Sequence, residues 1–240
     1  MSDRPIVQTR ILPPRRRNDL LTRQRLIDAM FDLIDKKLAL LIAPAGYGKT
    51  SLLVDFIQEI EFPVCWYSIS AHDQDPLRFL AHFIASIQEK FPDFGQSSLT
   101  ALHNASQGTL DLHYLVTTVI NDAYNNISEH FIIALEDFHL VDDVDPISEF
   151  ISDFIQGVDD NCTIIITSRK LVTLPDMTIL VARNMAGGLS YEELAFTPEE
   201  IQQLYLQNHQ QSLDTETAAN FYEQSEGWVT GLLLSSQINE

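Results

Sequence analysis

Short apolar segments alternate with longer amphipathic segments along the chain, and this pattern indicates strands separated by helices. The apolar segments have the length of buried strands and occupy residues 38–42, 64–68, 131–135, 163–167 and 178–181. Apolar residues recur at helical spacing in the segments between them, over residues 51–60, 76–91, 110–127 and 147–155. Strands that are apolar throughout are typical of parallel sheets with helices on both faces. We therefore predict an α/β fold with three layers.

The N-terminal region and one internal connection depart from this alternation. Pro13 and Pro14 indicate an extended arm, after which Thr22 is predicted to cap a helix that runs to about Ile34. Residues 94–109 are polar and are predicted to form an irregular connection.

The C-terminal region is predicted to be a small helical subdomain, because no apolar strand follows Phe196. Thr197 and Glu200 have the spacing of a capping box, which marks a helix start. Helices are predicted over residues 198–208, 214–224 and 229–236. The predicted parts are an N-terminal arm and helix over residues 1–37, an α/β domain over residues 38–196 and a helical subdomain over residues 197–240.

Residues 43–50 read A-P-A-G-Y-G-K-T between the first predicted strand and the next predicted helix. A glycine-rich turn in this place directs backbone N–H groups at a polyphosphate, and the following lysine and hydroxyl reach the phosphates and Mg²⁺. Ala43 stands where the usual pattern has glycine, while the other fixed positions match. A chance turn before an amphipathic helix is the alternative, but the strand-to-helix context favours nucleotide binding. The predicted contacts are Ala43, Pro44, Ala45, Gly46, Tyr47, Gly48, Lys49, Thr50 and Ser51.

Two acidic residues, Glu136 and Asp137, follow the third predicted strand. A phosphate-binding loop needs such residues at a neighbouring strand end to hold Mg²⁺ and to orient an attacking water. In one assignment, Glu136 and Thr50 hold the metal and Asp137 orients the water. In the other, Asp137 holds the metal and Glu136 is displaced. A plain acidic loop without either role is the third alternative.

Arg169 directly follows the fourth predicted strand, after Ser168. Ligands of open α/β sheets bind beyond the carboxyl ends of the strands, so this cation could touch a γ-phosphate. A surface arginine in an ordinary turn fits the spacing equally well.

The charge distribution disfavours direct nucleic-acid binding. The 240 residues carry a net charge of −19, although residues 1–37 hold nine Lys/Arg against five Asp/Glu. An acidic body repels a phosphate backbone, so DNA binding by this segment is not expected. The run Arg15–Arg17 is the exception, and it fits a solvated or acid-paired segment better than a nucleic-acid contact.

Composition also bears on the compartment. No apolar run approaches the roughly 20 residues that span a bilayer, and the charged, proline-containing N-terminus lacks the apolar core of a secretory signal. Cys65 and Cys162 each lie in or beside an apolar segment without metal-binding spacing, as core thiols in a reducing compartment would. We expect a cytoplasmic protein without membrane contact.

The order of these motifs resembles the N-terminal ATPase domain of MalT-like transcriptional activators, which belong to the STAND group of signal-transduction ATPases. The resemblance covers residues 10–234. The matching motifs, in order, are A-P-A-G-Y-G-K-T, W-Y-S with Asp75 and Phe79 soon after, Glu136-Asp137-Phe138-His139, Ser168-Arg169, L-A-F-T at 194–197 and Glu226-Gly227-Trp228.

The resemblance implies a P-loop NTPase sandwich with the strand order 5-1-4-3-2, which puts the Arg169 strand between those of Lys49 and Glu136. This placement favours Arg169 as a γ-phosphate sensor. The resemblance further implies an ATP-dependent switch that hydrolyses ATP slowly and oligomerises when ATP and an inducer are bound. Relatives continue through a winged helix and a repeat-rich sensor to a LuxR-type helix-turn-helix. The chain is therefore expected to be the N-terminal part of a longer protein, with DNA contacted only through a C-terminal domain absent here.

Four other positions are weaker candidates. The resemblance places Arg23 where relatives approach the adenine and phosphates, although a solvated arginine after a helix cap is an equal alternative. Trp228 lies where related ATPases have a G-x-P motif that touches the base; without that proline, a buried aromatic is expected. His139 is expected to be structural, and the segment from His72 to Asp75 is expected to form a turn.

The sequence thus predicts an ATP-dependent switch domain of a transcriptional regulator, with ATP or ADP and Mg²⁺ as cofactors. A small-molecule kinase is one alternative, disfavoured because only six Lys/Arg follow residue 37 and a kinase needs a basic lid. A nucleotide-binding interaction module that does not hydrolyse ATP is the other alternative, favoured if Glu136 cannot replace the usual aspartate.

Overall fold

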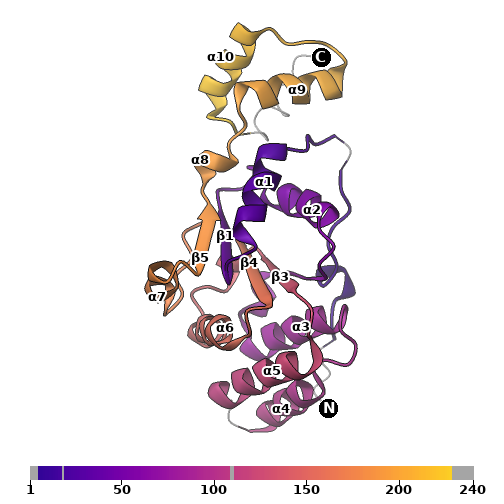
Figure 1. The fold of residues 1–240 in the computed structure, drawn as a ribbon, viewed down its shortest axis with the longest axis vertical. Coiled ribbons are helices and arrows are strands. Elements are labelled where there is room, and N and C mark those ends of the chain that lie inside the picture. The colour runs from indigo at the N-terminus through magenta and orange to yellow at the C-terminus, as the bar shows by residue number, and fades with distance from the viewer. Residues whose placement is uncertain (1–4, 18, 109–110, 229–240) are drawn as a thin grey trace.

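The computed structural model describes residues 5–17, 19–108 and 111–228, and its centre is a five-stranded parallel sheet (Figure 1). The strands are β1 (Leu38–Ile42), β2 (Val64–Ser68), β3 (Phe131–Glu136), β4 (Cys162–Ser168) and β5 (Ala186–Leu189). Their order across the sheet is β2-β3-β4-β1-β5, which confirms the expected order 5-1-4-3-2 read from the opposite edge. The central position of β4 brings the residues after it between the phosphate-loop strand and the acidic strand.

Helices cover both faces of the sheet, which confirms the three-layer prediction. Alternate residues of each strand face opposite layers, so two separate apolar cores form. One layer consists of α1 (Gln24–Leu33) and α2 (Lys49–Glu59). The other contains α3 (Pro76–Gln88), α5 (Leu112–Asn126) and α6 (Asp145–Gly157), with α4 (Gln96–Gln107) packed on α3 and α5. Figure 1 shows these two layers on either side of the strands.

The fifth strand lies after the predicted one. Residues 178–181 belong to the helix α7 (Met177–Ala182), in which Leu180 is buried while Ile179 and Val181 are exposed. The edge strand β5 reads A-G-G-L, a composition with low strand propensity. Its pairing with β1 explains Gly188, because a Cβ atom there would lie 2.3 Å from the Leu40 carbonyl oxygen.

Two further sequence predictions were wrong at the level of local structure. The polar segment 94–109 contains the helix α4, in which Ser98, Ala101 and Leu102 are buried and most of the other residues are polar. Arg23, not Thr22, is the N-cap of α1 and has no capping side-chain bond. The Thr22 hydroxyl instead accepts a hydrogen bond from Arg16 at 2.6 Å.

After the sheet, a short helix α8 (Tyr191–Leu194) leads to α9 (Pro198–His209) and α10 (Thr215–Ser225), which pack against each other beyond the sheet's end (Figure 1). The predicted capping box is present, since Thr197 accepts from the Glu200 N–H and the Glu200 carboxylate accepts from the Thr197 N–H. The predicted helix over 229–236 lies outside the described residues, and the domain division at residue 196 stays a prediction. Within the described ranges, no helix is both long and apolar enough to cross a membrane.

Candidate functional site

The loop between β1 and α2 wraps around the side chain of Lys49. Gly46 and Gly48 have φ angles of 88° and 80°, a left-handed conformation that glycine adopts without strain. Lys49 is only 7% exposed, and its ammonium donates to the carbonyls of Ala43 and, at 3.0 Å, Pro44. Burial lowers the pKa of Lys49, and the nearby Asp137 carboxylate partly opposes that shift. The loop therefore holds a desolvated cation at its centre.

A cavity of about 270 Å³ opens beside this loop and is lined by predicted site residues from three segments of the chain, together with two residues of the N-terminal arm. Its lining residues are Arg17, Leu20, Ala45, Gly46, Gly48, Lys49, Thr50, Ser51, Asp137 and Arg169. The loop, the acidic strand end and the arginine after β4 thus surround one space, although they are far apart in sequence.

Glu136 and Asp137 face different groups, which bears on the two assignments of the pair. Glu136 is 9% exposed, and its two carboxylate oxygens accept hydrogen bonds from Thr50 and, at 2.8 Å, Ser68. Asp137 turns toward the cavity with a φ of 58°, and its N–H donates to Thr167 at 3.0 Å. Glu136 therefore contacts the hydroxyl that would bind a metal, whereas Asp137 faces the open space.

Arg169 lies at the rim of the cavity, where its Nε atom is 3.7 Å from Asp137 Oδ1. Its side chain is half exposed, so it can move toward a bound anion. The neighbouring Lys170 turns away and pairs with Asp142 at 3.0 Å. His139 is partly buried with its Nδ1 atom 3.7 Å from Asp137 Oδ1, and burial lowers the pKa of His139.

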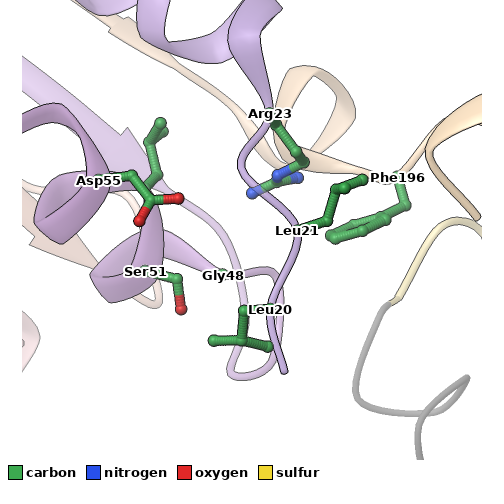
Figure 2. Close-up of a pocket in the computed structure, with 8 residues that line it drawn as sticks. Leu20, Leu21, Arg23, Gly48, Ser51, Asp55 and Phe196 are labelled. Carbon is green, nitrogen blue, oxygen red and sulfur yellow. The ribbon is translucent and has the colours of Figure 1, made fainter. Parts of the chain in front are cut away.

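Arg23 is buried beside the loop, which contradicts the alternative of a solvated arginine. It is 6% exposed, and its guanidinium donates to the carbonyls of Tyr47 at 3.2 Å and Leu194 at 2.6 Å. The same group lies 4.5 Å from the ring centre of Phe196. Figure 2 shows the two side chains near each other. Burial lowers the pKa of Arg23 to about 10. Arg23 thus links the phosphate loop to the segment after β5 through hydrogen bonds. A contact between Arg23 and the nucleotide stays a prediction.

Arg23 and the first turn of α2 line a small pocket of about 20 Å³ (Figure 2). Leu20, Leu21 and Phe196 give it apolar walls, and Ser51 lies at its polar side. The φ of 80° favours glycine at position 48, and a Cβ atom there would also press on the end of the Arg23 side chain, 3.0 Å from Nη2.

The N-terminal arm contributes more to the site than the sequence indicated. Arg16 pairs with Asp55 at 2.6 Å and Arg17 with Asp19 at 2.6 Å, which confirms the acid-paired interpretation of this basic run. Arg17 and Leu20 also line the cavity, however. The sequence did not indicate that Arg17 and Leu20 line the cavity, because neither residue belongs to a recognisable motif.

Trp228 does not form the buried aromatic contact that was expected. Its side chain is exposed, with 38% of its surface accessible, and its indole N–H donates to the Ala45 carbonyl at 2.8 Å. The reason is a backbone reversal at Gly227, where φ is 72° and the carbonyl accepts from the Phe196 N–H at 3.0 Å. The segment after α10 is thereby hydrogen-bonded to the phosphate loop.

The donor atoms near Thr50 suit a hard cation. The Thr50 hydroxyl and the Glu136 carboxylate offer oxygen only, which is the donor type that Mg²⁺ takes. Among the described residues, no group of three or more His, Cys, Asp or Glu could hold a metal by itself. Mg²⁺ fits such a site, because it usually binds through one or two protein oxygens together with waters and substrate phosphates.

A parallel sheet of order 5-1-4-3-2, with a glycine-rich loop and buried lysine after β1 and an acidic end on β3, defines a P-loop NTPase fold. Two solved structures share it. A STAND protein with a tetratricopeptide repeat sensor from Pyrococcus horikoshii matches 90% of this chain and 29% of its own, with a TM-score of 0.56 and 15% identity. The Walker-type ATPase of Pyrococcus abyssi matches 90% of this chain and 67% of its own, with a TM-score of 0.55 and 16% identity.

The sequence relatives are more specific, and they confirm the resemblance to the N-terminal domain of MalT-like regulators. The chain is 27% identical over 237 residues to the HTH-type transcriptional regulator MalT of Vibrio cholerae, which covers 95% of this chain. It is 28% identical over 231 residues to MalT of Yersinia pestis, with the same coverage. The chain spans about a quarter of the length of these curated relatives. No protein-family model matches it.

Proposed function

We propose that the chain is the ATP-binding and slowly hydrolysing switch domain of a signal-responsive transcriptional regulator, and that it self-associates when ATP is bound. The observation that carries this proposal is the single cavity in which Lys49, Thr50, Asp137 and Arg169 meet. The alignment with MalT over nearly the whole chain supports the regulatory context.

The positions of the side chains at the cavity suggest a role for each in binding or hydrolysing ATP. Lys49 and the loop N–H groups bind the phosphates, and Thr50 and Glu136 hold Mg²⁺, which neutralises developing charge on the phosphates when bound. Asp137 orients the attacking water, since its carboxylate faces the cavity while Glu136 faces Thr50. Arg169 contacts the γ-phosphate from the end of β4.

The two rival functions differ in what they need from the cavity. A kinase requires an acceptor pocket and a basic lid, yet the lining in the described part of the chain has three cations: Arg17, Lys49 and Arg169. Of these, Arg17 is already paired with Asp19. An interaction module without hydrolysis would keep the phosphate contacts but need no water-orienting acid.

One experiment separates the three functions. The chain is incubated with ATP and Mg²⁺, with and without candidate acceptors, while ADP release is followed and the assembly state is measured by sedimentation velocity. The switch predicts slow ADP release that acceptors do not change, and a larger sedimentation coefficient with ATP than with ADP. Acceptor-dependent turnover supports a kinase, and binding without turnover supports the interaction module.

We expect Asp137→Asn to slow ATP hydrolysis at least about tenfold while ATP affinity stays within a few-fold. A water-orienting carboxylate acts in the transition state, whereas the phosphate loop already binds ATP in the ground state. Single-turnover hydrolysis and calorimetry measure the two effects, with Asp143→Asn on the nearby surface as the matched control. If Asp137→Asn instead loses Mg²⁺-dependent binding, Asp137 holds the metal and the assignment of the pair is reversed.

We further propose that DNA is contacted through a C-terminal domain outside this chain. The net charge of −19 opposes the counterion release that drives non-specific DNA binding. Two of the three arginines in the basic run of the arm are paired with acids, Arg16 with Asp55 and Arg17 with Asp19.

A further inference from the structure

Ser68, the last residue of β2, lies between a buried tryptophan and the acidic residue Glu136. We propose that Ser68 is a positioning residue, which orients the Glu136 carboxylate for Mg²⁺ and so sets the Mg²⁺ dependence of nucleotide binding. The inference rests on the proposed function, since it concerns the metal that accompanies the nucleotide. Ser68 ends the W-Y-S segment of the resemblance, but no role was predicted for it.

The sheet register puts Ser68 and Glu136 side by side. In the β2–β3 ladder, Trp66 pairs with Ala134 and Ser68 pairs with Glu136. Since side chains alternate along a strand, these four residues share the face of the sheet that α2 covers. The helix α2 begins with Lys49 and Thr50, so Ser68 reaches the same acid as the phosphate loop does.

The hydrogen bonds around Ser68 have a fixed direction. The indole N–H of Trp66 donates to Ser68 Oγ at 2.8 Å, and an indole nitrogen can only donate. The Ser68 oxygen therefore accepts that bond, which leaves its single hydrogen to donate to Glu136 Oε2 at 2.8 Å. Trp66 is fully buried in the core under α2, so it holds the serine oxygen in one place.

The backbone of Ser68 is held from the other side by the N-terminal arm. Arg10 ends the short helix η1 (Gln8–Arg10), and its guanidinium donates to the Ser68 carbonyl through Nε at 2.8 Å and Nη2 at 2.6 Å. Arg10 also pairs with Asp73, which is 0% exposed and is bound by Arg78 at 3.1 Å as well. Asp73 was expected only as a turn residue, but it anchors the arm to this strand end.

Together these contacts assign the two oxygens of Glu136. Ser68 takes Oε2, so Oε1 is the oxygen that faces Thr50 and the loop. Without the serine hydroxyl, the Glu136 carboxylate keeps only the hydrogen bond from Thr50, so its orientation about the last side-chain bond is less restricted. Loss of an outer group that orients a metal ligand typically lowers metal affinity by about tenfold to a hundredfold.

The test is a titration of nucleotide affinity against Mg²⁺ for the unmodified chain and for Ser68→Ala. A fluorescent ATP analogue reports binding from excess EDTA to millimolar Mg²⁺, so the readout does not depend on hydrolysis. We expect Ser68→Ala to raise the Mg²⁺ concentration at half-maximal affinity about tenfold to a hundredfold. Affinity in EDTA should stay unchanged, because the loop contacts remain intact.

Two further variants separate positioning from simple destabilisation. Ser68→Thr keeps a hydroxyl and should restore the Mg²⁺ response. Ser86→Ala removes a fully buried serine of α3 whose hydroxyl donates to the Phe83 carbonyl at 2.7 Å, and it should leave the Mg²⁺ response unchanged. Thermal unfolding without nucleotide checks that all three variants fold.

Three results would overturn the inference. One is an unchanged Mg²⁺ midpoint in folded Ser68→Ala, and another is an equal loss of affinity with Mg²⁺ and with EDTA. The third is a Ser68→Thr variant that folds but behaves as Ser68→Ala does. Absence of nucleotide binding by the unmodified chain overturns the proposed function itself, and with it this inference, so the two failures are distinguishable.

Discussion

Replacing Lys49 with alanine is expected to abolish measurable binding of both ATP and ADP while the chain stays folded. The Lys49 ammonium lies inside the phosphate loop, where it is buried from solvent and donates hydrogen bonds to the carbonyls of Ala43 and Pro44. Each charge-assisted hydrogen bond that it makes to a polyphosphate contributes about 1.5–3 kcal/mol, and such bonds act on the triphosphate and the diphosphate alike. Calorimetric titration with each nucleotide measures the loss.

The control for this experiment is Lys170→Ala. It removes the same charge from a residue that pairs with Asp142 and does not line the cavity. We expect its affinities to stay close to those of the unmodified chain, and thermal unfolding without nucleotide should show that both variants are folded. Nucleotide affinity unchanged in Lys49→Ala would show that the loop is not the binding site.

The sequence was a good guide wherever a short segment carries its own signal. Four of the five strands were predicted close to their observed positions, because an apolar run of five residues has few places to lie except a buried sheet. The loop at residues 43–50 was recognisable for a similar reason, since its glycines, lysine and hydroxyl are contiguous. The capping box at Thr197 also depends on neighbours in sequence.

The predictions failed where a distant part of the chain decides the conformation. Gly187 and Gly188 form an edge strand that pairs with β1, where a Cβ atom on Gly188 would meet Leu40 and one on Gly187 would meet Leu33 and Lys36. A local propensity cannot show these contacts. Threonine is a residue type that often caps helices, but the Thr22 hydroxyl accepts a hydrogen bond from Arg16 instead of from the backbone of α1. Trp228 looks like a core residue in sequence, yet a reversal at Gly227 brings its indole to the Ala45 carbonyl.

The same distinction applies to the candidate site. The residues in contiguous motifs were named in advance, and the structure gathers Lys49, Thr50, Asp137 and Arg169 around one cavity, with Glu136 bonded to Thr50. The roles of the supporting residues were missed, because their partners are distant in sequence. Ser68 donates to Glu136 on the neighbouring strand, and Arg10 donates to the Ser68 carbonyl, 58 residues away. Groups of this kind become visible only when the sheet register is known.

Arg169→Ala is expected to narrow the difference in affinity between ATP and ADP. Arg169 directly follows the central strand β4 and lines the cavity together with Lys49 and Asp137. If it reaches the γ-phosphate, it stabilises only the triphosphate complex. Loss of one charge-assisted contact should weaken ATP binding by about 1.5–3 kcal/mol, or about tenfold to a hundredfold, and leave ADP nearly unchanged.

This difference matters because a ligand shifts a conformational equilibrium only through unequal affinity for the two states. A switch that distinguishes ATP from ADP therefore needs a group that detects the third phosphate, and Arg169 is the half-exposed cation beside Asp137 that can do so. Calorimetry with both nucleotides tests the prediction, with Arg183→Ala at the exposed end of α7 as the control. Equal weakening of ATP and ADP would assign Arg169 to the β-phosphate or to a structural role. No change in either affinity would leave it as an ordinary surface residue, and the switch would then need a different sensor.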